Sequence, residues 1–515
     1  MAKAYVEIEK QIARKESLQF AVETLTQNRH ISTIARKTYV SDVKAYLQSH
    51  GSVYDKKLAS FLRDSEVTRW ESFYESIIRK KKPSDLRVAY LSGPNPENDI
   101  EILVANGILP ENIWAFESDN KTYTAAVISA LESQFPFVKI YKGRIENYLK
   151  ILPFKFDIIY LDFCGAVTSD RTISVIRDVF FFQKLETVGV LITNFGLPNE
   201  VNQANEDIRR NINHLAANYL YPKPFTEEYS KLGGGNIESA EVQSITQKKF
   251  LRIAKKNERT FYSQFITRIL YDLPSVLIPY QRLSANPSLV NLFFKSFDKS
   301  SFNEDYEEDL YTFPNQHPMT WGLSNFFIKD GSFDSFLKKF NKQLSIFGDD
   351  RSLLESIEKV SYFMRERSGE DLHSDKLEHI RKNWKDAEKY IFCDVFMFHQ
   401  LKDILIGQLT APYFYNVEYT RRWAYKAKET EMFMDLITYD ECRYIFDWMP
   451  TLDMFEEGVN DMDRQLSLRF AMDSVAKQRT WYNDEFFYGT AVIDHNTPTF
   501  KVKELKKRKV IKLEP

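Results

Sequence analysis

Residues 87–117 read RVAYLSGPNPENDIEILVANGILPENIWAFE, and this stretch decides the fold class. It opens with a short apolar run, RVAYLS, turns at Gly93, continues with the helical pattern NDIEILVANG, and closes on a second apolar run, IWAFE. Runs that are apolar almost throughout, rather than alternating, are typical of strands buried on both faces. The stretch therefore predicts a strand–helix–strand unit whose two strands lie parallel.

The same alternation continues downstream of this unit. Further apolar runs occur at residues 137–141 (FVKIY), 156–162 (FDIIYLD) and 188–195 (VGVLITNF), with helical patterns between them. Buried strands that are separated by helices form parallel sheets with helices on both faces. The sequence therefore predicts an α/β fold with a doubly wound, mostly parallel sheet of five strands.

The pattern of apolar, aromatic and charged residues along the chain predicts four regions. They are an N-terminal helical segment (residues 1–84), the sheet domain (85–257), a mainly α-helical, aromatic-rich domain (258–500) and a basic tail (501–515). Within the third region, long aromatic-rich segments predict helices over residues 386–405 and 433–449, and the acidic, proline-containing residues 303–318 predict a linker or lid.

The bulk composition favours a folded, soluble protein. The 515 residues are 43% hydrophobic and 28% charged, with a formal net charge of −2. No apolar run approaches the ~18 residues that span a bilayer, and the N-terminus lacks the apolar stretch of a signal peptide. Cys164, Cys393 and Cys442 are widely spaced, which argues against a disulfide framework or a zinc site. We therefore expect a cytoplasmic protein with no metal site.

Two polar loops follow the first two predicted strands, at the end of the strands where α/β sheets bind ligands. The first contains Ser92, Gly93 and Asn95, and Gly93 supplies the residue without a Cβ that a sharp turn needs. The second contains Glu117 and Ser118, and an acidic side chain here can accept hydrogen bonds from both ribose hydroxyls. Together they predict a nucleotide-type ligand; a structural turn is the alternative for the first loop.

The next two loops add further candidates. Arg144 and Ile145 follow the third strand, either beside a ligand ring or in a surface loop that leads into a helix. Asp162 ends an almost wholly apolar strand, where a carboxylate is costly to bury unless it is paired or takes part in chemistry. It could orient a substrate group, accept a proton or cap the following turn.

Cys164 has no neighbour in sequence that marks an activating base. Asp119 could contact ligand or cap the next helix.

Taken in order, these segments resemble the class I S-adenosylmethionine-dependent methyltransferases over about residues 85–200. The resemblance rests on VAYLSGPNPEN at the first loop, AFESD at the ribose-binding acid, YKGRIENYL on the adenine side, FDIIYLDFCG at the catalytic loop and GVLITNFG at the fifth strand. The sequence departs from that family in having one glycine in the first loop, where the family often has three.

The resemblance implies a Rossmann-like methyltransferase sheet that binds S-adenosylmethionine. Gly93 and Glu117 would contact the methionine and ribose parts, Arg144 and Ile145 would lie near adenine, and Asp162, the implied catalytic residue, would face the substrate. The full set of implied cofactor-binding residues is Ser92, Gly93, Asn95, Glu117, Ser118, Arg144, Ile145 and Asp162.

Two functions remain open at this point. The first is methyl transfer to a large substrate, with RNA or DNA favoured by local basic patches at residues 79–82, 248–249, 255–256 and 506–509. The second is a catalytically degenerate scaffold in a multiprotein assembly, for example in antiviral defence or nucleic-acid processing, with protein partners bound by the helical C-terminal region. A nicotinamide-dependent oxidoreductase ranks last, because the GxGxxG turn is missing.

Overall fold

A computed structural model describes most of the chain. The described residues are 7–198, 203–220, 247–288, 290, 332–348, 350–365, 407–448, 461–479 and 507–512. The predicted helix over residues 386–405 and the predicted linker over 303–318 lie outside these ranges. In the described ranges, no helix combines the length and the apolar character that crossing a membrane requires.

The core of the molecule is a mostly parallel sheet that confirms the predicted α/β class. Its first five strands in sequence are β1 (Val88–Leu91), β2 (Ile113–Glu117), β3 (Lys139–Lys142), β4 (Phe156–Asp162) and β5 (Leu185–Leu197). The strand order is β3-β2-β1-β4-β5-β7-β6-β8, and the first five strands pair in parallel. From β1 the chain moves outward to β3 and then returns to β4 on the other side of β1. The order therefore reverses between β1 and β4.

Helices connect the parallel strands. They are α5 (Glu97–Ala105), α6 (Asn120–Glu132), α7 (Ile145–Ile151) and α8 (Thr172–Phe181), with the 3-10 turn η2 (Pro110–Asn112) before β2. Right-handed crossovers place the helices of the outward path and those of the return path on opposite faces of the sheet. The predicted helix over residues 172–185 is shorter than expected, because Leu185 already begins β5.

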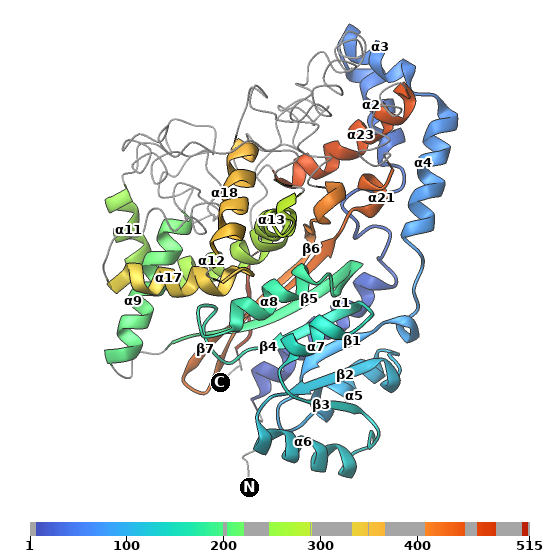
Figure 1. Cartoon of the computed structure of the whole chain (residues 1–515). Helices are drawn as coiled ribbons and strands as arrows, with labels where there is room; N and C mark the ends of the chain where they lie inside the picture. The colour runs from blue at the N-terminus through green and yellow to red at the C-terminus, as the bar shows by residue number, and fades with distance from the viewer. Residues whose placement is uncertain are drawn as a thin grey trace.

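The prediction of a mainly helical region over residues 258–500 is wrong for its central described part. Strands β6 (Phe414–Ala427) and β7 (Thr430–Asp440) form a hairpin there, and β7 pairs antiparallel with β5 (Figure 1). The predicted helix over residues 433–449 is therefore mostly strand, followed by the short helix α21 (Arg443–Phe446).

Two physical reasons explain this error. Strand β7 is buried at almost every position, and an apolar run that is buried on both faces has no period that separates strand from helix. The hairpin turn also lacks the usual Asn-Gly or Asp-Gly signal, since Lys428 takes the required positive φ of 53°.

The remaining elements surround this sheet. The N-terminal helices are α1 (Ile8–Leu25), α2 (Tyr39–His50), α3 (Val53–Phe61) and α4 (Asp64–Ile77), followed by η1 (Pro83–Asp85). After β5 come α9 (Gln203–Leu220), α11 (Gln247–Lys256), α12 (Glu258–Asp272), the π-helix η4 (Leu273–Leu277), α13 (Ile278–Ser284), α17 (Ser332–Leu344), α18 (Arg351–Arg365), α23 (Met462–Arg479) and β8 (Lys509–Val510). Helix α1 packs against α5 and against strands β5, β6 and β7, whereas α8 packs against α7, α13 and α17.

The described end of the basic tail is bound to the sheet. Strand β8 pairs in parallel with β6, and Arg508 forms an ion pair with the fully buried Asp435 of β7. The Arg508 guanidinium also donates hydrogen bonds to the backbone oxygens of Trp423 (3.1 Å) and Met434 (3.0 Å). Arg508 therefore anchors the described part of the tail, residues 507–512, to the sheet.

We expect Arg508→Ala to lower the free energy of unfolding by roughly 3 kcal/mol, because it leaves the Asp435 carboxylate buried without its main cation. The matched control is Lys509→Ala, which removes an exposed pair with Glu16 and is expected to cost less than about 1 kcal/mol. Urea denaturation of both variants measures the difference. Equal losses would show that the buried pair is not an anchor.

Candidate functional site

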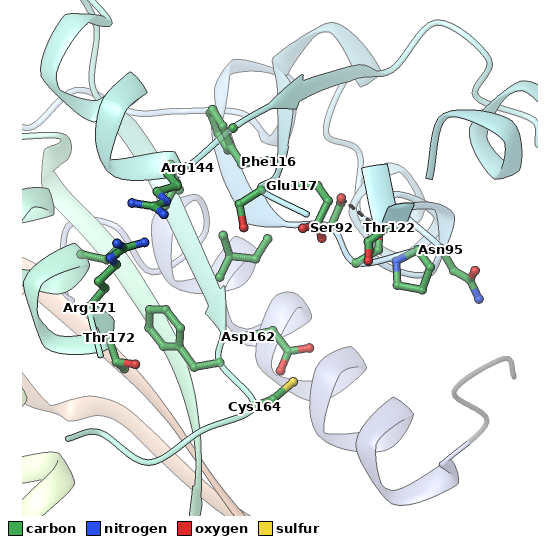
Figure 2. A pocket seen from close by; sticks show the side chains of 18 of the residues that line it. Ser92, Asn95, Phe116, Glu117, Thr122, Arg144, Asp162, Cys164, Arg171 and Thr172 are labelled. Carbon is green, nitrogen blue, oxygen red and sulfur yellow. Dashed lines mark hydrogen bonds between the residues drawn. The ribbon is translucent and has the colours of Figure 1, made fainter. Parts of the chain in front are cut away.

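A cavity of about 670 Å³ lies at the carboxyl edge of the sheet, where the strand order reverses. This is the place where open α/β sheets bind ligands, because loops from neighbouring strands diverge there. We call it the edge cavity. Its walls come from α1, from the loops after β1, β2, β3 and β4, and from the first residues of the helices that follow them (Figure 2).

The structure brings all the sequence-predicted site residues together around the edge cavity. Those residues are Ser92, Gly93, Asn95, Glu117, Ser118, Arg144, Ile145 and Asp162. They come from four loops within residues 92–162. Their individual roles in binding a cofactor stay predictions.

The loop after β1 owes its shape to Gly93. This residue has a φ of +60°, in the left-handed region that favours glycine. A Cβ built at Gly93 would meet nothing within 4 Å, so the backbone conformation and not the available space requires glycine there. Ser92, which is buried, continues the β1–β2 ladder by donating its backbone N–H to the Phe116 oxygen at 3.1 Å.

Glu117 ends β2 and directs its carboxylate into the edge cavity (Figure 2). One of its oxygens accepts a hydrogen bond from the backbone N–H of Asp119 at 2.8 Å, which fixes the side chain. Asp119 itself caps α6, accepting from the backbone N–H of Thr122 at 2.8 Å. The capping alternative for Asp119 is thus the observed one, while Glu117 faces the cavity.

Asp162 ends β4, and both of its carboxylate oxygens have partners. Oδ1 accepts a hydrogen bond from Asn194 Nδ2 at 2.8 Å, and Oδ2 lies 2.7 Å from Lys10 Nζ and 3.9 Å from Arg14 Nη2. Burial alone would raise the pKa of Asp162, but the charges of Lys10 and Arg14 and the hydrogen bonds from Lys10 and Asn194 outweigh it and lower the pKa. Asp162 is therefore an ionised group that is held in place.

Lys10 and Arg14 are site residues that sequence reasoning missed. They lie four positions apart on α1, so they project from one face of the helix into the edge cavity. Arg14 Nε lies 2.9 Å from Asp99 Oδ1, and both side chains are almost fully buried. No local sequence pattern predicts that α1 packs beside a loop about 150 residues away. The spacing of four between Lys10 and Arg14 was a sequence feature that could have indicated two cations on one face of a helix.

Asn194 lies within the fifth predicted strand, residues 188–195, and the structure extends that strand. Strand β5 continues to Leu197, so Asn194 is a buried strand residue. Its Nδ2 also donates to the Tyr425 hydroxyl of β6 at 2.8 Å. The edge cavity is thereby linked to the β6–β7 hairpin through Asp162 and Asn194.

Cys164 lines the edge cavity next to Asp162. Burial and the nearby Asp162 charge raise the pKa of the thiol above its usual range, although Lys10 opposes this. A raised pKa keeps the sulfur protonated at neutral pH and makes it a poor nucleophile. This raised pKa is consistent with the lack of an activating base next to Cys164 in the sequence.

Arg144 and Ile145 begin the return path at α7. Ile145 is buried, whereas Arg144 is exposed and occupies the N-cap position of α7. Arg171 lines the same cavity as the N-cap of α8, with a φ of +70°. Arg171 was also missed, because no sequence pattern shows that the far end of the loop after Asp162, where α8 begins, lies beside the cavity.

The basic patches predicted from sequence are partly neutralised. Lys81 Nζ lies 2.6 Å from Asp157 of β4, Arg508 pairs with Asp435, and Lys509 pairs with Glu16. These three cations have structural partners, which reduces the free positive charge of the described parts of residues 79–82 and 506–509. The side chains of residues 248–249 lie outside the described part of the chain.

Comparisons with known proteins do not assign the chain to a family. No protein-family model matches the sequence, and a search among curated proteins gives no match.

The buried Asp99 makes stability depend on pH. Burial raises the pKa of Asp99 from 3.8 to about 6, although the Arg14 charge opposes this. The folded carboxyl binds its proton more tightly than the unfolded one, so its contribution is fully present below pH ~4 and is lost as the pH rises through about 6.

Relative to Asp99→Asn, the wild-type free energy of unfolding should therefore fall by up to about 3 kcal/mol between pH 4 and pH 7. Urea denaturation at several pH values measures this difference. The matched control is Asp42→Asn, which makes the same change at an exposed position of α2. Parallel curves for Asp99→Asn would contradict the prediction.

Proposed function

We propose that the edge cavity binds S-adenosylmethionine and that the protein is a methyltransferase with a Rossmann-like sheet, acting on a large substrate, RNA or DNA. The observation that carries this proposal is the convergence of the Gly93 turn and the Glu117 carboxylate on one cavity at the point where the strand order reverses. Such a turn and such an acid are the two features that dinucleotide-type folds use for a nucleoside ligand.

The lining of the cavity supports a nucleoside-containing ligand. Glu117 offers a carboxylate at the end of β2, where a ribose would be bound. Phe116 and Ile145 give apolar surface beside it for a purine ring. The volume of about 670 Å³ lies within the range of small-molecule sites, about 300–1,000 Å³.

Methyl transfer needs little chemistry from the protein, because the sulfonium of the cofactor already activates the methyl group. The protein then has to place the acceptor atom in line with that group. Asp162 is suited to orienting an acceptor rather than to taking its proton, since its pKa is lowered and both oxygens have partners. We therefore assign Asp162 a positioning role.

A second candidate function is a binding module without catalysis. The observation that favours it is the Lys10 ammonium, which lies 2.7 Å from Asp162 on the cavity wall that would face the acceptor. The Lys10 ammonium of α1 would then occupy the position beside Asp162 that a substrate group would take in an active enzyme. In that case the protein binds a nucleoside ligand and transfers no methyl group.

Binding of S-adenosylhomocysteine to the full chain, measured by calorimetry, tests the cofactor site. We expect Glu117→Gln to weaken binding about tenfold to hundredfold, because a charged acceptor for the ribose hydroxyls is lost. The matched control is Asp119→Asn, which makes the same change two residues away and retains a good helix cap. Equal affinities for wild type and Glu117→Gln would contradict the proposed site.

Transfer of labelled methyl groups separates the two functions. The methyltransferase is expected to leave label on RNA or DNA from cells, and Asp162→Asn should lower the rate at least about tenfold by misplacing the acceptor. Cofactor binding without label on any cellular RNA, DNA or protein would favour the binding module. Lys10→Met tests the blocking role of α1, since an α1 block predicts that this variant gains transfer activity.

A further inference from the structure

Two arginines stand at the same end of neighbouring helices. Helices α7 and α8 both begin at the carboxyl edge of the sheet and pack against each other. Arg144 is the N-cap residue of α7 and Arg171 is the N-cap residue of α8. Both line the edge cavity, and Figure 2 shows their guanidinium groups pointing toward each other, away from Ser92 and Asn95.

These two arginines differ from the cations of α1 in having no acidic partner among the residues that the structure describes. Lys10 and Arg14 are neutralised by Asp162 and Asp99. Within the described part of the chain, no carboxylate lies at ion-pair distance from Arg144 or Arg171, and neither side chain donates a hydrogen bond there. The edge cavity therefore has a wall whose positive charge is not compensated.

The acids closest in sequence do not neutralise them. Asp170 precedes Arg171, but its carboxylate lies 2.8 Å from Lys339 Nζ on α17. Glu146 lines the cavity from the first turn of α7 without forming an ion pair with either arginine in the described ranges. An anion bound between two like charges would offset their mutual repulsion.

An aromatic ring follows Asp162 at the end of β4. Phe163 follows Asp162, lines the cavity and is only half-buried. Its ring stacks on Phe195 of β5, with centroids 5.7 Å apart and an interplanar angle of 19°. A supported and partly exposed ring of this kind is a surface on which a nucleobase can stack.

We infer that Arg144 and Arg171 bind a phosphate group of a nucleotide substrate whose base stacks on Phe163. Guanidinium groups match phosphate oxygens in a bidentate geometry, and two of them match its negative charge. The N-terminus of the ten-residue helix α8 adds partial positive charge at Arg171. The inference rests on the proposed function for the assignment of this nucleotide as substrate, with the cofactor on the Glu117 side of the cavity.

Fluorescence anisotropy of the full chain with a labelled single-stranded 12-nucleotide RNA, and with the matching DNA, tests the inference. We expect Arg171→Gln and Arg144→Gln each to weaken binding about tenfold. Each variant should also lower the slope of log affinity against log salt by about 0.7, the value for one phosphate contact on a single strand. Lys121→Gln removes one positive charge from the α6 side of the same cavity and should change the affinity by less than about twofold.

Competition identifies the source of the phosphate. Displacement of the RNA by adenosine 5′-monophosphate but not by adenosine would show that a mononucleotide is sufficient, whereas displacement by oligonucleotides alone would assign the site to a polynucleotide. Arg171→Lys, which keeps the charge, should recover only part of the affinity, because the ammonium group lacks the guanidinium fork. Circular dichroism of every variant checks that the fold is retained.

Three results would overturn the inference: wild-type affinity in both arginine variants, equal losses in Arg171→Gln and Lys121→Gln, or displacement by an acidic peptide in preference to the nucleotides. Binding of S-adenosylhomocysteine to Arg171→Gln is measured in parallel and should equal that of the wild type. If that ligand binds neither protein while the arginine effects persist, the proposed function fails and the phosphate site stands.

Discussion

The structure depends on the hydrogen bonding of strand β5. This strand is buried along almost its whole length, so its backbone N–H and C=O groups need partners on both sides. Strand β4 supplies partners on one side, in parallel, and β7 supplies them on the other, antiparallel, from Val188↔Asp440 to Leu197↔Glu431. Because β7 lies more than 200 residues later in the chain, the first half cannot complete its own sheet.

This requirement explains how much of the fold the sequence could predict. The first five strands were predicted, four of them to within two residues of their observed ends, since buried parallel strands are marked by short apolar runs between helical patterns. The hairpin of β6 and β7 was not, because its partner strand is remote and its turn uses Lys428 in place of glycine or asparagine. Local patterns identify elements, but pairing across long separations has no local signal.

The candidate site shows the same division. Gly93, Glu117 and Asp162 were found because parallel strands bring their carboxyl ends, and the loops that follow, to one edge of the sheet. Lys10 and Arg171 were not found, because their positions depend on how α1 packs and on where a loop returns to α8. The acidic residues of the site were therefore predicted from the sequence, whereas Lys10 and Arg171 were not.

The two sets of charges give the edge cavity its asymmetry. On the α1 side, Lys10 and Asp162 neutralise each other, and Asp162 is joined through Asn194 to the Tyr425 hydroxyl of β6. On the side of α7 and α8, Arg144 and Arg171 face the cavity and form no ion pair with any described residue. A neutral, rigid wall is suited to holding a reacting group in place, and a positive wall is suited to capturing an anion.

The neutral wall of the cavity also depends on elements that lie far apart in the sequence. The neutral wall exists only when α1, β4, β5 and β6 are assembled, since each contributes one member of the chain of contacts from Lys10 to Tyr425. A break in any of these contacts leaves a buried polar or charged group without its partner, which is costly. The geometry at Asp162 is therefore coupled to the folding of both halves of the protein, and the residues of the first five strands alone would not reproduce it.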